Sequence, residues 1–106
     1  MTHQQPTLDQ VREFAPKLME VTDDVLFGDI WEREGLSPRE RSLIVVATLT
    51  ALYRTNELPS HIKRAIANGI SKEELAEVFT HLAFYAGWPC AITAIRTAIV
   101  TLEDLE

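Results

Sequence analysis

The sequence predicts an all-α domain, and it does so on three observations. No stretch alternates apolar and polar residues in the way that is typical of β-strands. Apolar and small residues instead recur at helical spacing, most clearly at Leu43, Val46, Ala47, Thr50 and Ala51. Helix-start motifs stand in front of two such stretches. We therefore expect a small multi-helix fold with short connections.

The first helix is predicted to begin at Pro16 and to end at Gly28. Proline suits a first helical turn because its missing N–H costs no hydrogen bond there, and glycine suits a helix end. The apolar side chains of this helix are Leu18, Met19, Val25 and Phe27.

The second helix is predicted to begin at Pro38 and to reach about Tyr53. Ser37 and Glu40 form a capping box, in which each side chain bonds the backbone N–H of the other residue. A shorter helix fits between Tyr53 and Gly69, with Thr55 or Asn56 as its cap. Pro59 then falls in the first turn of that helix.

Two further helices complete the prediction. Ser71 and Glu74 form a second capping box just after Asn68-Gly69, a sequence that suits a helix end. Gly87-Trp88-Pro89 then ends one helix and opens the last, which should run to about Leu102.

Composition indicates one globular domain over residues 1–106, with its core at about 27–102. The chain has 106 residues, of which 46% are hydrophobic and 25% charged. We find no internal repeat or interdomain linker. A domain of this size buries only about two thirds of its unfolded surface, so its helices would gain stability by packing against further copies of the chain.

The charge distribution argues against nucleic-acid and anionic-membrane partners. The net charge is -6, and the sequence has no run of Lys and Arg. A small anionic molecule remains compatible with a few arginines. Residues 1–10 lack the apolar core of a signal peptide, and no later run is long enough to span a bilayer, so the expected compartment is the cytoplasm.

Two pairs of residues place a carboxylate one helical turn from an imidazole. Glu57 precedes His61, and Glu77 precedes His81, with Tyr85 one turn further on. A carboxylate so placed can orient the ring and raise its pKa, which suits a general acid or base. Exposed helices often carry this spacing without any catalytic role, so for either pair alone a structural histidine is the more common explanation.

Arg41 and the segment from Thr80 to Pro89 are further candidates for a functional role. Arg41 stands in a first helical turn, where its positive charge is mildly unfavourable, which suggests either a buried salt bridge or an anion site. The segment from Thr80 to Pro89 concentrates aromatic residues and a histidine, a pattern that is more often core or subunit interface than substrate site. Cys90 is the only cysteine, which excludes an intrachain disulfide and a CxxC pair.

The order of these motifs resembles that of γ-carboxymuconolactone decarboxylases over about Phe27 to Ala98. The matching stretches are Gly35 to Leu43, Glu57-Leu58 with His61, Asn68 to Ser71 with Glu73-Glu74 and Glu77, and Ala83 to Pro89. The resemblance implies an all-α fold of the alkylhydroperoxidase-like type, whose subunits form closed rings, commonly trimers or hexamers.

The resemblance also implies a decarboxylase that needs no cofactor or metal. Loss of carbon dioxide from a carboxylated lactone leaves a dienolate, which Arg41 would stabilise and His61 would protonate, oriented by Glu57 or Glu77. The residues expected to bind the substrate are Arg54, His81, Tyr85 and Trp88. His81 and Trp88 depart from the usual pattern of the family and suggest an altered pocket.

Three alternatives accompany this hypothesis. Related alkylhydroperoxidase-like reductases carry a CxxC pair before the histidine that matches His61, but Arg54 and Glu57 occupy those positions here, which argues against a thiol peroxidase. A ligand-binding or stress-related oligomer would keep the fold without catalysis. A metal site of Glu57, His61, Glu77 and His81 is chemically acceptable, but the residues lack the spacing of di-iron carboxylate bundles.

Overall fold

The computed structural model describes residues 5–105, and every regular element within them is helical. The all-α prediction is therefore confirmed. Residues 1–4, which belong to the polar N-terminal stretch, and residue 106 lie outside the described residues. No helix in the described part of the chain is long and apolar enough to cross a membrane. The chain divides into two compact units, Met1–Gly35 and Leu36–Glu106.

The first unit contains short helical elements. Helix α1 spans Leu8–Phe14, and helix α2 spans Pro16–Val21. The chain then continues as a π-helical segment, η1, over Thr22–Phe27, and as a 3₁₀ turn, η2, over Ile30–Glu32.

The segment predicted as one helix from Pro16 to Gly28 is helical between those bounds, but only its first half is an α-helix. The backbone N–H of Gly28 donates to the carbonyl of Asp23, five residues earlier, at 2.9 Å, so the second half of the segment is π-helical. Helix α1 was not predicted. Its start could have been, because Thr7 and Gln10 form a capping box.

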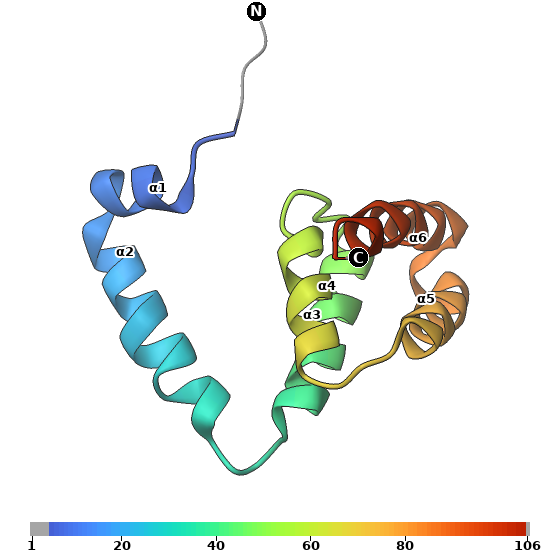
Figure 1. Ribbon diagram of the computed structural model, residues 1–106, viewed down its shortest axis with the longest axis horizontal. Helices are drawn as coiled ribbons and strands as arrows, with labels where there is room; N and C mark the ends of the chain where they lie inside the picture. Colours follow the sequence, from blue (N-terminus) through green and yellow to red (C-terminus); the bar gives the residue numbers. More distant parts are fainter. Residues whose placement is uncertain (1–4, 106) are drawn as a thin grey trace, which may run out of the picture. The chain divides into compact units, whose positions relative to one another are not determined.

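The second unit contains four longer helices. These are α3 (Pro38–Ala51), α4 (Leu58–Ala67), α5 (Lys72–Ala86) and α6 (Trp88–Glu103). Helix α3 packs against α4 and α5, and α6 packs against the same two helices from the other side. Helices α4 and α5 therefore occupy opposite corners of the unit, as can be followed in Figure 1.

One hydrophobic core holds these four helices together. Its largest fully buried side chains include Phe79 of α5 and Leu58 and Ile62 of α4. The other buried members are Val46, Ala65, Ile70, Leu75, Ala94 and Ala98. At roughly 1.5–3 kcal/mol for each large apolar side chain removed from water, this burial dominates the stability of the second unit.

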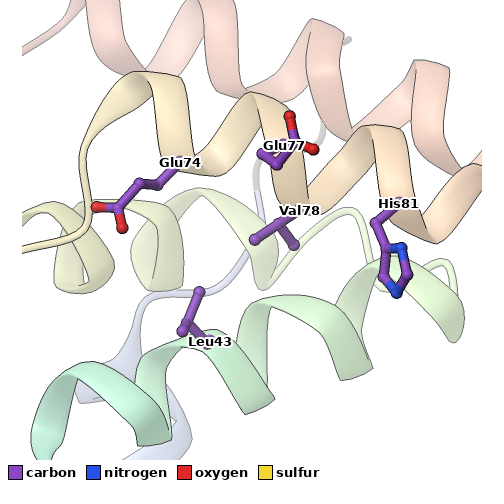
Figure 2. A pocket seen from close by; sticks show the side chains of 5 residues that line it. All are labelled: Leu43, Glu74, Glu77, Val78 and His81. Carbon is purple, nitrogen blue, oxygen red and sulfur yellow. The ribbon is translucent and has the colours of Figure 1, made fainter.

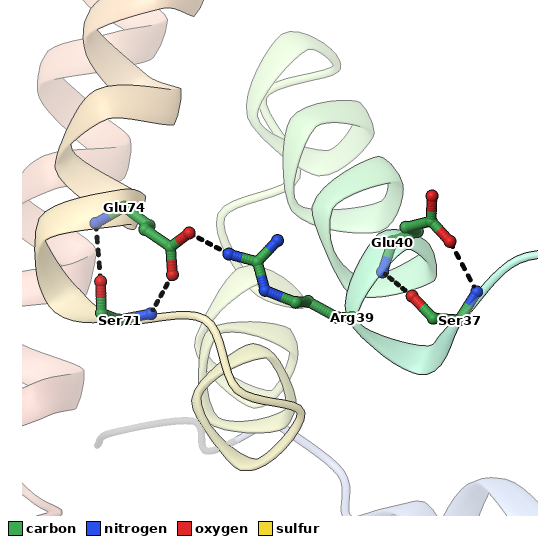
Figure 3. A network of polar contacts seen from close by, with 5 residues as sticks. All are labelled: Ser37, Arg39, Glu40, Ser71 and Glu74. Atoms are coloured by element: carbon green, nitrogen blue, oxygen red, sulfur yellow. Dashed lines mark hydrogen bonds and ion pairs between the residues drawn. The ribbon is translucent and has the colours of Figure 1, made fainter.

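Both predicted capping boxes are present, and an ion pair connects them (Figure 3). The backbone N–H of Ser37 donates to Glu40 at 2.8 Å, and that of Ser71 donates to Glu74 at 3.0 Å. These bonds are the main reason why the pKa of each carboxyl lies below its usual value. The second carboxylate oxygen of Glu74 accepts a hydrogen bond from Arg39, so the start of α5 is tied to the first turn of α3.

The connection from α3 to α4 explains why the predicted cap of α4 is wrong. Neither Thr55 nor Asn56 caps the helix; the cap position is Glu57, without a side-chain cap. The N–H groups of Glu57 and Leu58 donate to the carbonyl of Arg54 instead, so backbone satisfies donors that a cap would otherwise bond. Pro59 lies in the first turn of α4, as predicted.

Tyr53 holds an unusual backbone conformation at the end of α3. Its φ is 59°, in the left-handed region that glycine adopts more easily. The Tyr53 N–H donates to Thr50, and the Arg54 N–H donates to Leu49, the two bonds of a Schellman motif. The hydroxyl of Tyr53 lies 3.3 Å from that of Thr93 on α6.

Candidate functional site

A polar stripe follows one side of α4 and the loop before it. We call Arg54, Glu57, His61 and Arg64 the α4 stripe, because their spacing of three or four residues places them on one side of a helix. Arg54 Nη2 lies 2.6 Å from Glu57 Oε1 in an ion pair. The other oxygen of Glu57 is buried and accepts no hydrogen bond in the described structure.

His61 is the half-buried centre of this stripe. Its Nδ1 is buried and has no hydrogen-bond partner within residues 5–105. Burial lowers the pKa of His61 below its usual value, and the positive charge of Arg64 lowers it further. The expectation that a neighbouring carboxylate raises this pKa is therefore wrong, since His61 is predominantly neutral at pH 7. Two buried groups of complementary chemistry, an imidazole and a carboxylate, thus stand one turn apart without a mutual hydrogen bond.

Arg41 lies in the first turn and a half of α3, the helix that packs against α4. Its side chain is half-buried, and its Nε atom is buried. This placement fits either of the roles predicted for it, a buried salt bridge or an anion site.

A separate groove lies between α3 and α5, and we call it the α3–α5 groove. Its volume is about 390 Å³, and its lining comprises Leu43, Glu74, Glu77, Val78 and His81. Figure 2 shows Leu43 and Val78 pointing toward one another across the groove, with His81 pointing toward α3. Glu77 is exposed and forms no ion pair or hydrogen bond with any other described residue. The groove thus combines an apolar floor with a carboxylate and an imidazole on its rim.

Aromatic side chains continue from the groove to the end of α5. The rings of His81 and Tyr85 have centroids 5.0 Å apart, and those of Phe84 and Trp88 are 5.2 Å apart. Tyr85 is 78% exposed, Phe84 73% and Trp88 57%, so these rings are not part of the core of the chain. We call Phe84, Tyr85 and Trp88 the aromatic patch.

Apart from Arg41 and the aromatic residues Tyr85 and Trp88, the residues predicted for the site fall into two groups. Arg54, Glu57 and His61 form one group on the α4 stripe, whereas Glu77 and His81 line the groove that no α4 residue enters. Sequence analysis missed the groove-lining residues Leu43, Glu74 and Val78. Residues 74, 77, 78 and 81 are spaced as one face of a helix, which would have predicted that Glu74 and Val78 accompany Glu77 and His81.

The described residues contain no group of three or more His, Cys, Asp or Glu side chains that could hold a metal ion. The ligand set considered from the sequence is divided between the same two places, with Glu57 and His61 in one and Glu77 and His81 in the other. Cys90 is a half-buried free thiol in the first turn of α6.

Comparisons with known proteins point to one family. Residues 16–99 match the sequence profile of the carboxymuconolactone decarboxylase family. The chain is 33% identical to 4-carboxymuconolactone decarboxylase of Acinetobacter baylyi over 103 residues, which cover 97% of this chain and 77% of the relative. It is 31% identical to nitrosuccinic acid decarboxylase of Metarhizium robertsii over 86 residues, 81% of this chain and 60% of that relative. A Paracoccus denitrificans protein of uncharacterised function is 29% identical over 87 residues, 78% of this chain and 65% of its own length.

Proposed function

The chain belongs to the carboxymuconolactone decarboxylase family, and on that premise we propose that it catalyses the cofactor-free decarboxylation of a small carboxylated lactone or keto acid. Two of its relatives are named as decarboxylases, one for 4-carboxymuconolactone and one for nitrosuccinic acid. Both compounds are small carboxylic acids with a further group that can accept negative charge. The proposed substrate class is therefore a small anion whose carbanion is stabilised by conjugation.

The observation that carries this proposal is the α4 stripe. It places the half-buried imidazole of His61 between Glu57, which pairs with Arg54, and the positive charge of Arg64. Decarboxylation breaks the bond between the carboxylate carbon and the ring, and the bonding electrons move into a dienolate. Arginine side chains stabilise this oxyanion, and an imidazole then delivers a proton to carbon.

The lowered pKa of His61 means that the ring must take up a proton before it can donate one. In the free protein His61 is neutral at pH 7, because burial and Arg64 disfavour the imidazolium. A bound substrate carboxylate brings a negative charge that favours the imidazolium, so substrate and proton bind together. Glu57 supports the same change, since its buried oxygen can accept a hydrogen bond from the Nδ1–H of the ring. Nε2 is then the atom that donates the proton.

Turnover of γ-carboxymuconolactone by the wild type and by His61→Ala tests the proposal. We expect turnover by the wild type and a loss of about 10²-fold or more in kcat for the variant, the usual contribution of a general acid. Lys63→Ala is a matched control, because Lys63 is exposed on the same helix outside the stripe. Undiminished turnover by His61→Ala would remove His61 as proton donor. If the wild type turned over none of a panel of unsaturated lactones and keto acids but bound them, ligand binding would become the better assignment.

A further inference from the structure

The ion pair between Arg54 and Glu57 stands at the start of the α4 stripe. Arg54 Nη2 and Glu57 Oε1 are 2.6 Å apart. The backbone of Arg54 is held in place, because its carbonyl accepts the N–H groups of Glu57 and Leu58. Its side chain is 59% exposed, and ion pairs that water reaches in this way add little net stability. The guanidinium can therefore leave Glu57 for another anion without disturbing the start of α4.

Glu57 and His61 each keep one buried polar atom that has no hydrogen bond within residues 5–105. These atoms are Oε2 of Glu57 and Nδ1 of His61. Glu57 has helical backbone angles although it is the cap position of α4, so the spacing of four residues brings both side chains to the same side of the helix. A carboxylate oxygen accepts a hydrogen bond, and Nδ1 of an imidazole can donate one. The two residues are thus suitable partners that do not bond each other in the free protein.

The surroundings of His61 indicate that Arg54 is what keeps Glu57 from the ring. Burial and then the charge of Arg64 lower the pKa of His61, and the charge of Glu57 does not reverse that direction. Arg54 is not among these causes, so its own charge does not act on the ring. The same holds for the charged and titratable residues of the two helices packed against α4, which are Arg39, Glu40 and Arg41 on α3 and Cys90, Arg96 and Glu103 on α6. Any influence of Arg54 on His61 must therefore pass through Glu57.

We propose that the carboxylate of the substrate takes Arg54 from Glu57, and that Glu57 then bonds Nδ1 of His61. Arg54 binds the substrate, and Glu57, once released, positions the proton donor. The exchange suits these groups, because a guanidinium can pair with either carboxylate through two parallel N–H bonds. This inference rests on the proposed function for the role of His61. It adds that the proton donor forms only when a carboxylate is bound.

The exchange accounts for the proton that decarboxylation consumes. A carboxylate beside the ring favours the imidazolium, so His61 takes up a proton from water when Glu57 reaches it. Loss of carbon dioxide leaves the bonding electrons on the substrate, and Nε2 of His61 then delivers the proton to carbon. The ring is neutral again at this point. Departure of the product returns Arg54 to Glu57.

NMR titration of His61 tests the exchange without any substrate. His61→Gln assigns the imidazole signals, and the affinity of His61 for a proton is measured in the wild type and in Arg54→Gln. We expect a rise of about tenfold in Arg54→Gln, because Glu57 is then released to bond the ring. In a Glu57→Gln background the same substitution should change the proton affinity by less than about twofold. Arg54→Lys, which keeps a cation beside Glu57, should resemble the wild type.

Arg64→Gln is the matched control, because Arg64 acts on His61 directly. Its substitution should raise the proton affinity of His61 by a similar factor with and without Glu57, whereas the effect of Arg54 should require Glu57. An unchanged proton affinity in Arg54→Gln would overturn the inference, and so would a rise of equal size in both backgrounds. Circular dichroism checks the fold of each variant. We expect it to be kept, since the bonds at the start of α4 use the backbone of Arg54.

Succinate serves as a carboxylate probe of the exchange itself. We expect it to raise the proton affinity of His61 in the wild type but not in Arg54→Gln, in which Glu57 is already released. Calorimetric titration at pH 7 in buffers of different ionisation enthalpy should therefore detect proton uptake with the wild type alone. Succinate that binds the wild type without proton uptake would contradict the exchange.

Failure of this inference and failure of the proposed function are distinguishable. A wild type that turns over no lactone would remove the proposed function, and the NMR titrations would still decide whether Arg54 controls the contact between Glu57 and His61. Turnover that depends on His61, together with an unchanged proton affinity in Arg54→Gln, would leave the decarboxylase proposal standing and remove the exchange.

Discussion

The two units of the chain use their apolar residues in opposite ways. The second unit buries Phe79, Leu58 and Ile62 almost completely. Among the described residues of the first unit only Met19 is buried, whereas Phe14 is 93% exposed and Leu8 71%. Isolated helices as short as α1 and α2 are marginal in water without such burial. The comparison shows that helix-start motifs are sufficient to begin a helix, but that a shared core is what makes a set of helices cooperative.

The largest difference should come from removing one phenylalanine in each unit. We expect Phe79→Ala to lower the free energy of unfolding by about 3–5 kcal/mol, because it leaves a cavity in the core. Phe14→Ala should change it by less than about 0.5 kcal/mol, because the ring is exposed. Denaturant unfolding followed by circular dichroism measures both. Equal losses would show that Phe14 is covered in solution, and the contrast between the units would fail.

Helix caps offer a subtler comparison. Ser37→Ala and Thr7→Ala each remove the side-chain half of a capping box, which typically costs ~1 kcal/mol of local helix stability. We expect the global unfolding midpoint to fall for Ser37→Ala only, because α3 contributes to the core and α1 buries no residue. Hydrogen exchange should detect the loss in α1 of Thr7→Ala as faster exchange of its amides. A global midpoint that falls equally in both variants would mean that the units unfold as one.

The left-handed residue at the end of α3 should respond to glycine. Tyr53→Gly relieves a conformation that a side chain disfavours, and we expect up to about 1 kcal/mol of stabilisation. Tyr53→Phe, which keeps the ring and removes the hydroxyl near Thr93, serves as the control. If glycine destabilises the protein and phenylalanine does not, ring contacts outweigh the backbone strain.

The smallest expected effect is a pH dependence of stability caused by His61. Its folded pKa lies below the usual value of 6.5, so the unfolded chain takes up a proton first as the pH falls. The contribution of His61 is therefore neutral above about pH 6.5, becomes unfavourable as the pH falls below that value, and levels off below the folded pKa. We expect His61→Gln to lose less stability than the wild type between pH 7.5 and pH 5, measured as a shift in the denaturation midpoint. Parallel losses in the two proteins would contradict the buried, neutral imidazole.

Local chemistry predicted the second unit well. Ser37, Ser71 and Gly87 stand where the structure begins or ends its helices, because capping bonds and a positive φ act within a few residues of sequence. The same rule identifies Thr7 as a helix start, although the stretch around it is polar and has no apolar residues at helical spacing before Leu8. The π-helical segment over Thr22–Phe27 had no comparable motif, since it depends on a five-residue hydrogen bond that sequence spacing does not specify.

The sequence predicted candidate residues for the site, but it did not predict which of them lie close together in space. Helical spacing placed Glu57 one turn from His61, but it gave no distance between His61 and Glu77, because it relates residues only within one helix. Tertiary packing separates the two carboxylates, since α4 and α5 both pack on α3 and α6. The direction of the pKa of His61 was likewise beyond the sequence, because burial of the ring depends on how α4 is packed.

The bond between Arg39 and Glu74 also predicts which positions should vary together among homologous sequences. Glu74 serves two partners, Ser71 on its own helix and Arg39 on another, so exchanging it disturbs a helix start and a helix contact at once (Figure 3). Glu40, by comparison, bonds only the serine at the start of its own helix, Ser37. Among homologues, substitutions at position 74 should therefore be accompanied by changes at position 39, whereas Ser37 and Glu40 should vary as a pair of their own. That asymmetry would let an alignment recover the neighbourhood of α3 and α5 without any coordinates.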